Sequence, residues 1–278
     1  MSGPATVQGP GAIEPAADYD QMVDWGKRLA REAPFFERLF DEVGVERLAD
    51  VGCGSGKHAI MFRQWGIEVV GIDPSESMLA QARRNATEAG VDVEFVEGGF
   101  GEVVGLVGAG LDAVVSLGNG LPHVGGEEGL RATLADVAAA LRPGGVIVLH
   151  LLNHERLIGQ RIRMMPPTFR ETSEGDRVFL KVLDYRDDGI LFDFVTLTRP
   201  PGAEPSPDNA FAEGGPDVTG WYLRSRRSLH AALPVSLLET ALAEAGFTDV
   251  EAFGDHTGRS LAVDADESVI VVARRLGA

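Results

Sequence analysis

The sequence of 278 residues predicts an α/β protein with a doubly wound, mostly parallel sheet of seven strands and an antiparallel β insertion between strands five and six. Three observations support this fold class. Short apolar runs alternate with helix-like segments over about 150 residues, which is typical of a parallel sheet. A glycine-rich loop joins the first of these strands to its helix. After Asn153 the alternation stops, and two long strand-like runs flank the hairpin signal Asp187-Asp188-Gly189.

The first half of the chain carries regular strand and helix signals. An amphipathic helix is expected over residues 20–43, with a break at Pro34, because proline removes a helical hydrogen bond. The other elements follow from apolar runs bounded by glycine and proline. Strands are expected at 46–52, 67–73, 91–97, 111–117 and 146–152, and helices at 57–65, 74–90 and 129–141.

The second half begins with the antiparallel insertion. Strands are expected on both sides of the hairpin signal and again at 219–231, with an exposed Pro/Gly-rich loop at 200–216 before the last of them. The chain then returns to elements of the α/β type. These are a helix at 234–246 and strands at 248–254 and 268–275.

Composition narrows the class of partner. The formal net charge of −17 disfavours DNA or RNA, whose phosphates require clustered Lys and Arg, and suits a small-molecule acceptor. The single cysteine, Cys53, excludes an internal disulfide and a cysteine-rich zinc site, and no metal is expected. No apolar window is long enough for a membrane span, and the Gly/Pro-rich start does not resemble a signal peptide. We therefore expect a cytoplasmic protein with neither membrane nor nucleic-acid partners, and assembly as a homodimer stays open.

The stretch Asp50–Gly56, DVGCGSG, is a candidate ligand-binding loop. Gly52, Gly54 and Gly56 let the backbone turn sharply and approach a ligand that a Cβ would repel, and amides at the next helix N-terminus can face a polar cofactor. Dinucleotide sites also use such loops, but here the spacing is G-x-G-x-G and an acid precedes the first glycine by two residues. Asp73 ends the second strand, where a ribose diol would meet a carboxylate in a doubly wound fold, although it could also cap the following helix.

These segments resemble the class I S-adenosylmethionine-dependent methyltransferases. The shared features are the acid and G-x-G-x-G of DVGCGSG, the acid ending strand two in GIDPSESML, LRPGG before strand five and AGF before strand six. The resemblance covers most of Leu48–Leu152 and Leu237–Arg275. It implies an enzyme whose cofactor is S-adenosylmethionine and whose product is S-adenosylhomocysteine. The implied domains are a flexible arm (1–19), a cofactor-binding α/β domain (20–154 and 232–278) and an insertion forming a substrate lid (155–231).

The resemblance implies cofactor-binding roles for several residues. Asp50 would bond near the cofactor's amino group, and Asp73 would accept from the ribose hydroxyls. Where the family has an acid for the adenine amine, this sequence has Gly99, so either Glu97 or Glu102 substitutes or the adenine bonds to backbone alone. The full set is Asp50, Gly52, Gly54, Gly56, Asp73, Ser75, Met78 and Leu117, together with Tyr19, Trp25 and Arg28 on an N-terminal segment that would close over the cofactor.

The segment LGNGLPHV, residues 117–124, leaves the carboxyl end of strand four, where ligands of open α/β sheets bind. Asn119 could serve a bare turn, because asparagine tolerates a positive φ, but a turn does not need His123. SLGNGLPHV and the later LLNHERL resemble the glycine and sarcosine N-methyltransferase branch of the family. That resemblance implies that Asn119 contacts the substrate during catalysis, that His123 lines or supports the pocket, and that Asn153 contributes to it.

The resemblance to the glycine and sarcosine enzymes does not identify the methyl acceptor. Where the glycine enzymes have an arginine for the substrate carboxylate, this sequence has Leu152, so another arginine replaces it or the substrate lacks a carboxylate. Candidate replacements are Arg156, Arg161 and Arg170. Side chains of the insertion would shape the pocket, namely Tyr185, Trp221, Tyr222 and Arg224, of which Tyr222 and Arg224 are assigned to substrate binding.

Methyl transfer from a sulfonium is an in-line displacement with a good leaving group, so positioning dominates. An amine needs a free lone pair, whereas a hydroxyl needs a base such as His123 or His154. His58 is expected as a cofactor-side wall or helix cap and His150 as packed core, and no role is assigned to His230 or His256. We expect transfer to the nitrogen of a small amine. The alternatives are O-methylation of a small metabolite or natural product, an NAD-dependent oxidoreductase, and a non-catalytic cofactor-binding protein.

Overall fold

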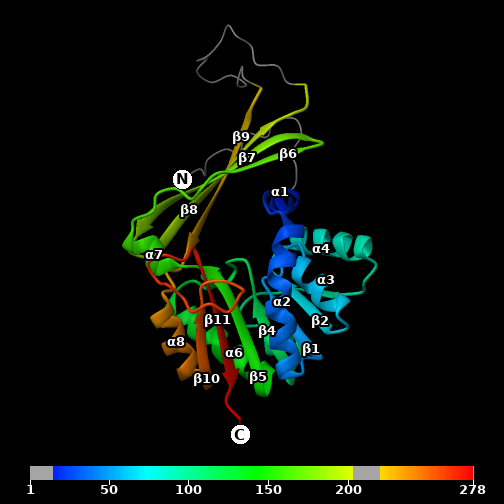
Figure 1. Ribbon diagram of the computed structural model, residues 1–278, viewed down its shortest axis with the longest axis vertical. Helices are drawn as coiled ribbons and strands as arrows, with labels where there is room; N and C mark the ends of the chain where they lie inside the picture. The colour runs from blue at the N-terminus through cyan, green and yellow to red at the C-terminus, as the bar shows by residue number, and fades with distance from the viewer. Residues whose placement is uncertain (1–14, 203–219, 278) are drawn as a thin grey trace.

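The computed structural model describes residues 15–202 and 220–277, and its core is a seven-stranded sheet (Figure 1). The strand order is β10-β11-β5-β4-β1-β2-β3. Strands β1 to β5 pair in parallel, and β11 is antiparallel to both β5 and β10. This confirms the predicted mostly parallel sheet. The strands are β1 (Arg47–Val51), β2 (Glu68–Asp73), β3 (Glu94–Glu97), β4 (Leu111–Ser116), β5 (Leu141–Leu152), β10 (Phe247–Phe253) and β11 (Ser268–Arg275).

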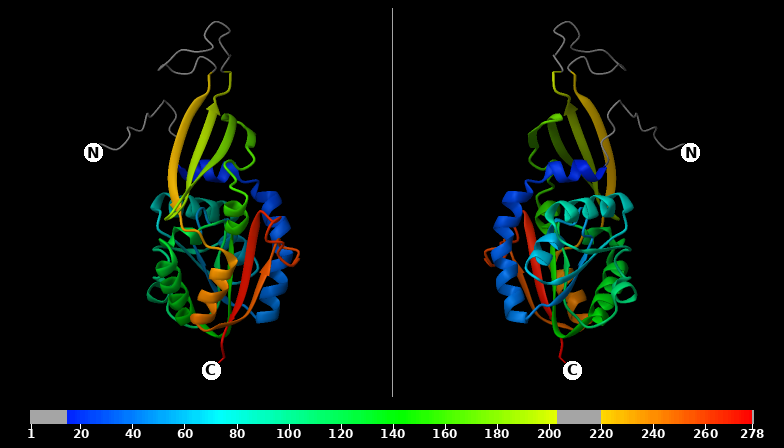
Figure 2. Two further views of the ribbon diagram at one scale, coloured as in Figure 1. Left: turned by 90° about the vertical axis from the view of Figure 1, so that its left-hand side faces the viewer. Right: turned by 90° about the vertical axis from the view of Figure 1, so that its right-hand side faces the viewer.

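Helices cover both faces of this sheet (Figure 2), which confirms the doubly wound arrangement. On one face, aromatic and aliphatic side chains such as Phe36, Phe62 and Leu79 pack against the strands. On the other, Leu134 and Leu238 do so. The first face carries α2 (Trp25–Val43), α3 (Lys57–Gln64) and α4 (Glu76–Ala89), and the second carries α5 (Val103–Val107), α6 (Glu127–Ala140) and α8 (Val235–Glu244).

The insertion between β5 and β10 forms a separate antiparallel sheet in the order β6-β7-β8-β9, as the sequence predicts. It stands beyond the carboxyl ends of the parallel strands (Figure 1). The turn at Asp187-Asp188 joins its two longest strands, while β6 and the short helix α7 were not predicted. The elements are α7 (His154–Gly159), β6 (Thr168–Thr172), β7 (Gly175–Arg186), β8 (Gly189–Arg199) and β9 (Tyr222–His230).

The N-terminal region differs from the prediction. Helix α1 (Pro15–Met22) begins inside the segment 1–19 expected to be a flexible arm, and residues 1–14 lie outside the described residues. The helix break falls at Asp24 and not at Pro34, because the Asp24 carboxylate caps α2 by accepting from the Lys27 amide. The expected loop at 200–216 also lies largely outside the described residues. Within the described part of the chain, every helix is too short or too polar to span a bilayer.

Candidate active site

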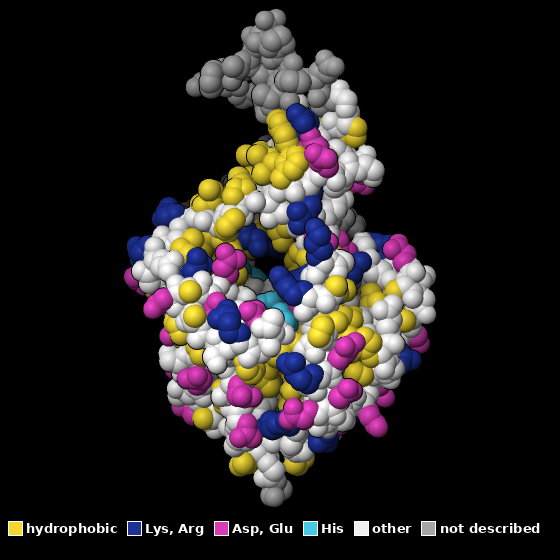
Figure 3. Space-filling model, in the orientation of Figure 1, with side chains coloured by type: hydrophobic (Ala, Val, Ile, Leu, Met, Phe, Trp, Pro, Cys, Tyr) yellow, Lys and Arg dark blue, Asp and Glu magenta, His cyan; other side chains and the backbone are white. Residues whose placement is uncertain are grey.

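The candidate site lies where the carboxyl ends of the parallel strands face the small sheet. Figure 3 shows a hollow between the two sheets, with Lys and Arg side chains around its opening and His side chains on its floor. The loops after β1 and β4 meet here, because a Cβ built on Gly52 would lie 3.8 Å from the Gly120 Cα. The structure therefore brings together the loop predicted for the cofactor and the segment predicted for the substrate.

The glycine-rich loop is held by backbone bonds to β2. The amides of Gly52 and Cys53 both donate to the Ile72 carbonyl, at 2.8 and 3.1 Å. Gly52, Gly54 and Gly56 all have positive φ, between 56° and 75°, which only glycine adopts without strain. A side chain also has no room at Gly56, since a Cβ there would lie 2.8 Å from the Phe95 ring. The third glycine thus serves tight packing of the loop against β3.

Two carboxylates end the strands beside this loop. Asp73 accepts from the amides of Gly54 and Ser75, each at 2.9 Å, and burial raises its pKa. Asp50 is 1% exposed, and its Oδ2 has no partner among the described residues. Burial and the nearby Asp73 raise the pKa of Asp50 to about 7. A buried carboxylate oxygen without a hydrogen-bond donor is unfavourable, so we expect a bound ligand to supply a cation or a donor here.

A cation without a full set of partners lies at the same place. Arg28 on α2 donates from Nε to Glu32 Oε1 at 2.9 Å and packs over the Trp25 ring, yet its Nη2 is buried and finds no acceptor within the described residues. A Cβ built on Gly118 would lie 3.7 Å from the guanidinium and 3.2 Å from the Tyr19 hydroxyl. Tyr19 and Arg28 thus border the β4 loop, and their cofactor-binding role stays a prediction.

These unsatisfied groups fit the amino-acid end of S-adenosylmethionine. Its ammonium would meet the Asp50 carboxylate and its carboxylate would meet the Arg28 guanidinium, so each buried charge would gain an opposite charge. The N-cap at Ser75, whose hydroxyl accepts from the Met78 amide, lies two residues after Asp73. Both the ribose and the adenine roles expected for this stretch stay predictions.

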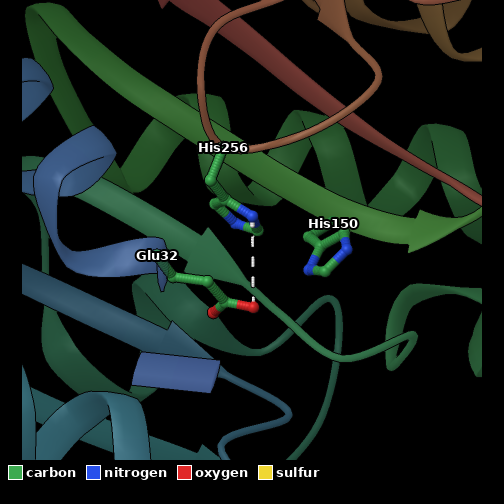
Figure 4. Close-up of side chains that lie close together, drawn as sticks. All are labelled: Glu32, His150 and His256. Atoms are coloured by element: carbon green, nitrogen blue, oxygen red, sulfur yellow. Dashed lines mark ion pairs between the residues drawn. The ribbon is translucent and has the colours of Figure 1, made fainter. Parts of the chain in front are cut away.

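Arg28 is held by a buried cluster around Glu32, of which Figure 4 shows Glu32, His150 and His256. Glu32 is fully buried, and its Oε2 lies 2.7 Å from His58 Nε2, while His256 Nδ1 lies 4.0 Å from Oε1. Burial alone would raise the pKa of Glu32, but the hydrogen bond to His58 and the charge of Arg28 lower it overall. Burial lowers the pKa of His150 to about 3 and of His256 to about 4. The cluster therefore holds an ionised carboxylate among neutral imidazoles.

Ligand atoms of Glu32, His150 and His256 lie within 4.8 Å of one another, a spacing that could suit a metal ion. However, both oxygens of Glu32 are already engaged, Oε1 by Arg28 and Oε2 by His58. A metal ion would have to displace a guanidinium that is itself positively charged. We therefore assign this cluster to fixing Arg28.

On the acceptor side, Asn119 joins three strands. Its φ is 71°, its amide donates to the His150 carbonyl at 3.1 Å, and its Oδ1 accepts from the Leu152 amide at 2.8 Å. Its Nδ2 lies 3.3 Å from His230 Nδ1, at the end of β9. Asn119 therefore both makes the turn and ties β4 and β5 to the small sheet.

Two imidazoles face each other beside Asn119. His123, on the 3-10 turn η1 (Leu121–Val124), lies edge-on to His230, with ring centroids 4.5 Å apart. Desolvation by the surrounding residues and the charge of Arg226 lower the pKa of His123, and burial lowers that of His230 to about 3. His230 is buried and stacked on Phe192, and its Nε2 has no partner among residues 15–202 and 220–277. Sequence reasoning missed His230.

Other expected acceptor residues are engaged elsewhere. Asn153 caps α7, accepting from the Arg156 amide and donating to the carbonyls of Val263 and Asp266, so its amide group has no hydrogen left for a substrate. Tyr185 donates to main-chain carbonyls around α7, and Arg170 donates to the Met22 carbonyl. His154, considered as a base, accepts from the Leu233 amide. These side chains support the junction between the sheets.

The positions of Tyr222 and Arg224 do not agree with their expected role in substrate binding. Both lie near the start of β9, whereas its last residue, His230, reaches the site. At roughly 3.3 Å per residue, six to eight residues put them about 20–26 Å away along the strand. The structure does not bring these two side chains to the hollow beside Asn119.

Comparison with known proteins agrees with this geometry. A family model described as a methyltransferase domain matches residues 48–145. The glycine/sarcosine N-methyltransferase of Aphanothece halophytica is 26% identical over 85% of this chain and 79% of its own. That of Parasynechococcus marenigrum is 34% identical over 50% of each chain, so this match spans about half the length of that relative.

Solved structures share the fold. An S-adenosylmethionine-dependent methyltransferase from Clostridium acetobutylicum superposes with a TM-score of 0.73 at 13% identity, covering 94% of this chain and 98% of that one. CalS10, an S-adenosylmethionine-bound amino pentose methyltransferase from Micromonospora echinaspora, gives 0.69 at 20% identity over 96% and 99%. With the family match and the loop geometry, this chain is a class I S-adenosylmethionine-dependent methyltransferase, and S-adenosylmethionine is its cofactor.

Proposed function

We propose that this enzyme transfers the methyl group to the nitrogen of a small amine. The observation that carries this proposal is the neutral character of the acceptor side. Asn119, His123 and His230 present an amide and two imidazoles whose pKa values are lowered, so the pocket offers no strong base. A neutral amine needs none, because its lone pair attacks a good leaving group directly. A hydroxyl acceptor would need a base with a pKa near 7.

The names of relatives point the same way. Two curated proteins that this chain resembles are glycine/sarcosine N-methyltransferases, and a solved structure of the same fold acts on an amino pentose. All three names describe amine acceptors or amino sugars. They support nitrogen as the acceptor atom and leave its carrier to experiment.

The residues divide the work as follows. Arg28 and Asp50 would hold the two charged ends of the cofactor's methionine part, and Asp73 the ribose, so that the loops after β1 and β4 enclose the sulfur. When bound, the cofactor supplies an electrophilic methyl group. The Asn119–His230 contact would fix the small sheet over this point, the methylated amine would lose its proton to solvent after transfer, and His123 would line the pocket as a neutral imidazole. The sheet β6–β9 would thus act as the lid of a cofactor domain formed by 20–154 and 232–278.

The test is an acceptor panel with matched pairs. Recombinant protein and S-adenosylmethionine are incubated with primary and secondary amines, among them glycine, sarcosine and an amino sugar, and with hydroxyl compounds of the same shape. We expect S-adenosylhomocysteine and a methylated product only from amines, with a rate that rises with pH as the acceptor loses its proton. Turnover restricted to the hydroxyl compounds would overturn the assignment in favour of O-methylation.

Cofactor identity has an independent check in calorimetry. S-adenosylhomocysteine should bind, whereas NADH should not, because the G-x-G-x-G loop and the Arg28–Asp50 pair suit an amino acid group and not a pyrophosphate. Binding of NADH alone would contradict the site described above.

A further inference from the structure

One face of the small sheet looks into the hollow. Side chains alternate along strands, so Phe192 and Phe194 on β8 point to the same side, and their rings stack at 5.9 Å. His230 stacks on Phe192 at 4.3 Å and contacts Asn119 of the large domain. The face that carries these three side chains is therefore the one turned toward the transferred methyl group.

Two cations lie on this face, one on each side of Phe194. Lys181 on β7 and Arg226 on β9 are its direct cross-strand neighbours. Lys181 Nζ lies 6.0 Å and Arg226 Cζ lies 5.2 Å from the centre of the Phe194 ring. Across the described residues, neither forms an ion pair with a carboxylate. Lys181 is half-buried, and its burial lowers its pKa, which is the response of a charge that lacks a counter-ion.

The opposite face of the same sheet shows a different pattern. There Arg227 contacts Asp193 at 2.7 Å, and Arg199 pairs with Asp176. Arg227 is the neighbour of Arg226 in sequence but points the other way, and its charge is balanced by protein. The chain has 42 acidic and 25 basic residues, so carboxylates are abundant, yet none balances the two inward cations within the described residues.

We propose that Lys181 and Arg226 form a subsite for an oxyanion, a carboxylate, sulfate or phosphate group, carried by the methyl acceptor. The proposal rests on the amine methylation argued above and adds the second recognition element of that acceptor. It supplies the cationic partner that Leu152 cannot provide. Figure 3 agrees, since Lys and Arg side chains surround the hollow whose floor carries His.

The position of the subsite also constrains the shape of the acceptor. Arg226 lies four residues before His230 on β9, which is about 13 Å at roughly 3.3 Å per residue, and the Phe194 ring stands level with the two cations with its centre 6.2 Å from that of His230. An α-amino acid carries its nitrogen and carboxylate on one carbon and cannot reach both places. The acceptor therefore has its nucleophilic nitrogen and its oxyanion at opposite ends of an apolar spacer that lies on Phe194.

A binding experiment tests the subsite without turnover. The protein loaded with S-adenosylhomocysteine is titrated with sodium sulfate and sodium phosphate at constant ionic strength. We expect Lys181→Met and Arg226→Gln each to weaken anion binding roughly tenfold or more, the loss of one charge-assisted hydrogen bond. Arg227→Gln removes the same charge from the outward face and should bind as the wild type does. Equal affinity in all four proteins, or no binding to the wild type, overturns the subsite.

Thermal unfolding distinguishes loss of the anion site from loss of folding. Lys181→Met removes a half-buried charge, so its melting temperature should equal or exceed that of the wild type. Added sulfate should raise the melting temperature of the wild type and of Arg227→Gln but not that of Lys181→Met. A variant that melts lower is replaced by Lys181→Gln, which keeps a polar end group. Sulfate stabilisation that persists in Lys181→Met contradicts the proposal.

An acceptor series then tests the spacing. Glycine, 4-aminobutyrate and 6-aminohexanoate are compared with amines of the same length that lack the carboxylate. The longer amino acids should have the lower KM, and Lys181→Met should remove that advantage while kcat stays close to wild type. Preference for glycine would refute the spacer. If no amine is methylated, the proposed function fails, whereas loss of sulfate binding in both variants still establishes the subsite.

Discussion

The buried Asp50 carboxylate predicts a conflict between stability and cofactor binding. Its pKa lies at about 7 in place of the ordinary 3.8, because it is buried and close to Asp73. The folded protein therefore holds its proton more tightly than the unfolded chain does, and stability falls as the pH rises from about 4 to 7. At ~1.36 kcal/mol per pKa unit, keeping Asp50 ionised above pH 7 costs the folded state about 4 kcal/mol.

Asp50→Asn removes this cost and keeps the shape of the side chain. At pH 8 we expect the variant to be more stable than the wild type by up to about 4 kcal/mol, and at pH 5 by only about 2 kcal/mol, since the wild type is then largely protonated when folded. Urea unfolding at both pH values measures the difference. Asp41→Asn, on an exposed position of α2, is the matched control and should change stability little.

The same substitution should damage the site. Loss of the charged partner for the cofactor's ammonium should weaken S-adenosylhomocysteine binding by roughly 10- to 100-fold. In the wild type, binding should release about half a proton at pH 7, because the ammonium ionises Asp50. Calorimetry in buffers of different ionisation enthalpy detects that proton. An Asp50→Asn protein that is no more stable at pH 8, or that binds the ligand normally, would refute the reasoning.

Three further substitutions follow from individual contacts. Gly56→Ala places a Cβ within 2.9 Å of neighbouring side chains and should cost about 1–3 kcal/mol in urea unfolding, clearly more than Gly90→Ala, which has positive φ but open space. Glu32→Gln should weaken S-adenosylhomocysteine binding several-fold through a less constrained Arg28, and unchanged affinity would show that the cluster only packs. Asn119→Gly keeps the turn and removes the side chain, so kcat should fall while cofactor affinity stays within a few-fold, and unchanged steady-state kinetics would reduce Asn119 to a turn residue.

Local patterns were sufficient to predict most of the fold. Apolar runs of five or six residues between helices define buried parallel strands, and only a doubly wound sheet buries both of their faces. The exceptions have local causes. The strand β6, TFRET, alternates weakly and pairs along a single edge, so it left no clear signal. The break expected at Pro34 is absent, because burial of Phe35, Phe36 and Phe40 in the core outweighs the hydrogen bond that the proline removes, and the helix instead begins at the Asp24 cap.

The arrangement of the residues expected at the cofactor could be predicted because they follow one another closely in sequence. Asp50, the glycine loop and Asp73 lie within one β-α-β unit, whose geometry is fixed by short connections. The acceptor side has no such continuity. His230 meets Asn119 across 111 residues, and nothing in a single sequence indicates that contact. Tyr222 was expected at the pocket as a side chain of the insertion, but the direction of β9 brings the other end of the strand to the site.

Asn119 shows why a structural and a functional reading of one residue need not exclude each other. Its positive φ makes the turn that leaves β4, and this turn aims its amide at the Leu152 backbone and at His230. The residue that bends the chain is thus also the one that ties β4 to the small sheet. His230 continues through Phe192 to Phe194 and its two cations, so in the proposed acceptor site the same contact would set the distance between the nucleophilic nitrogen and the oxyanion. On that proposal, acceptor selectivity would depend on this single amide as much as on the two charges.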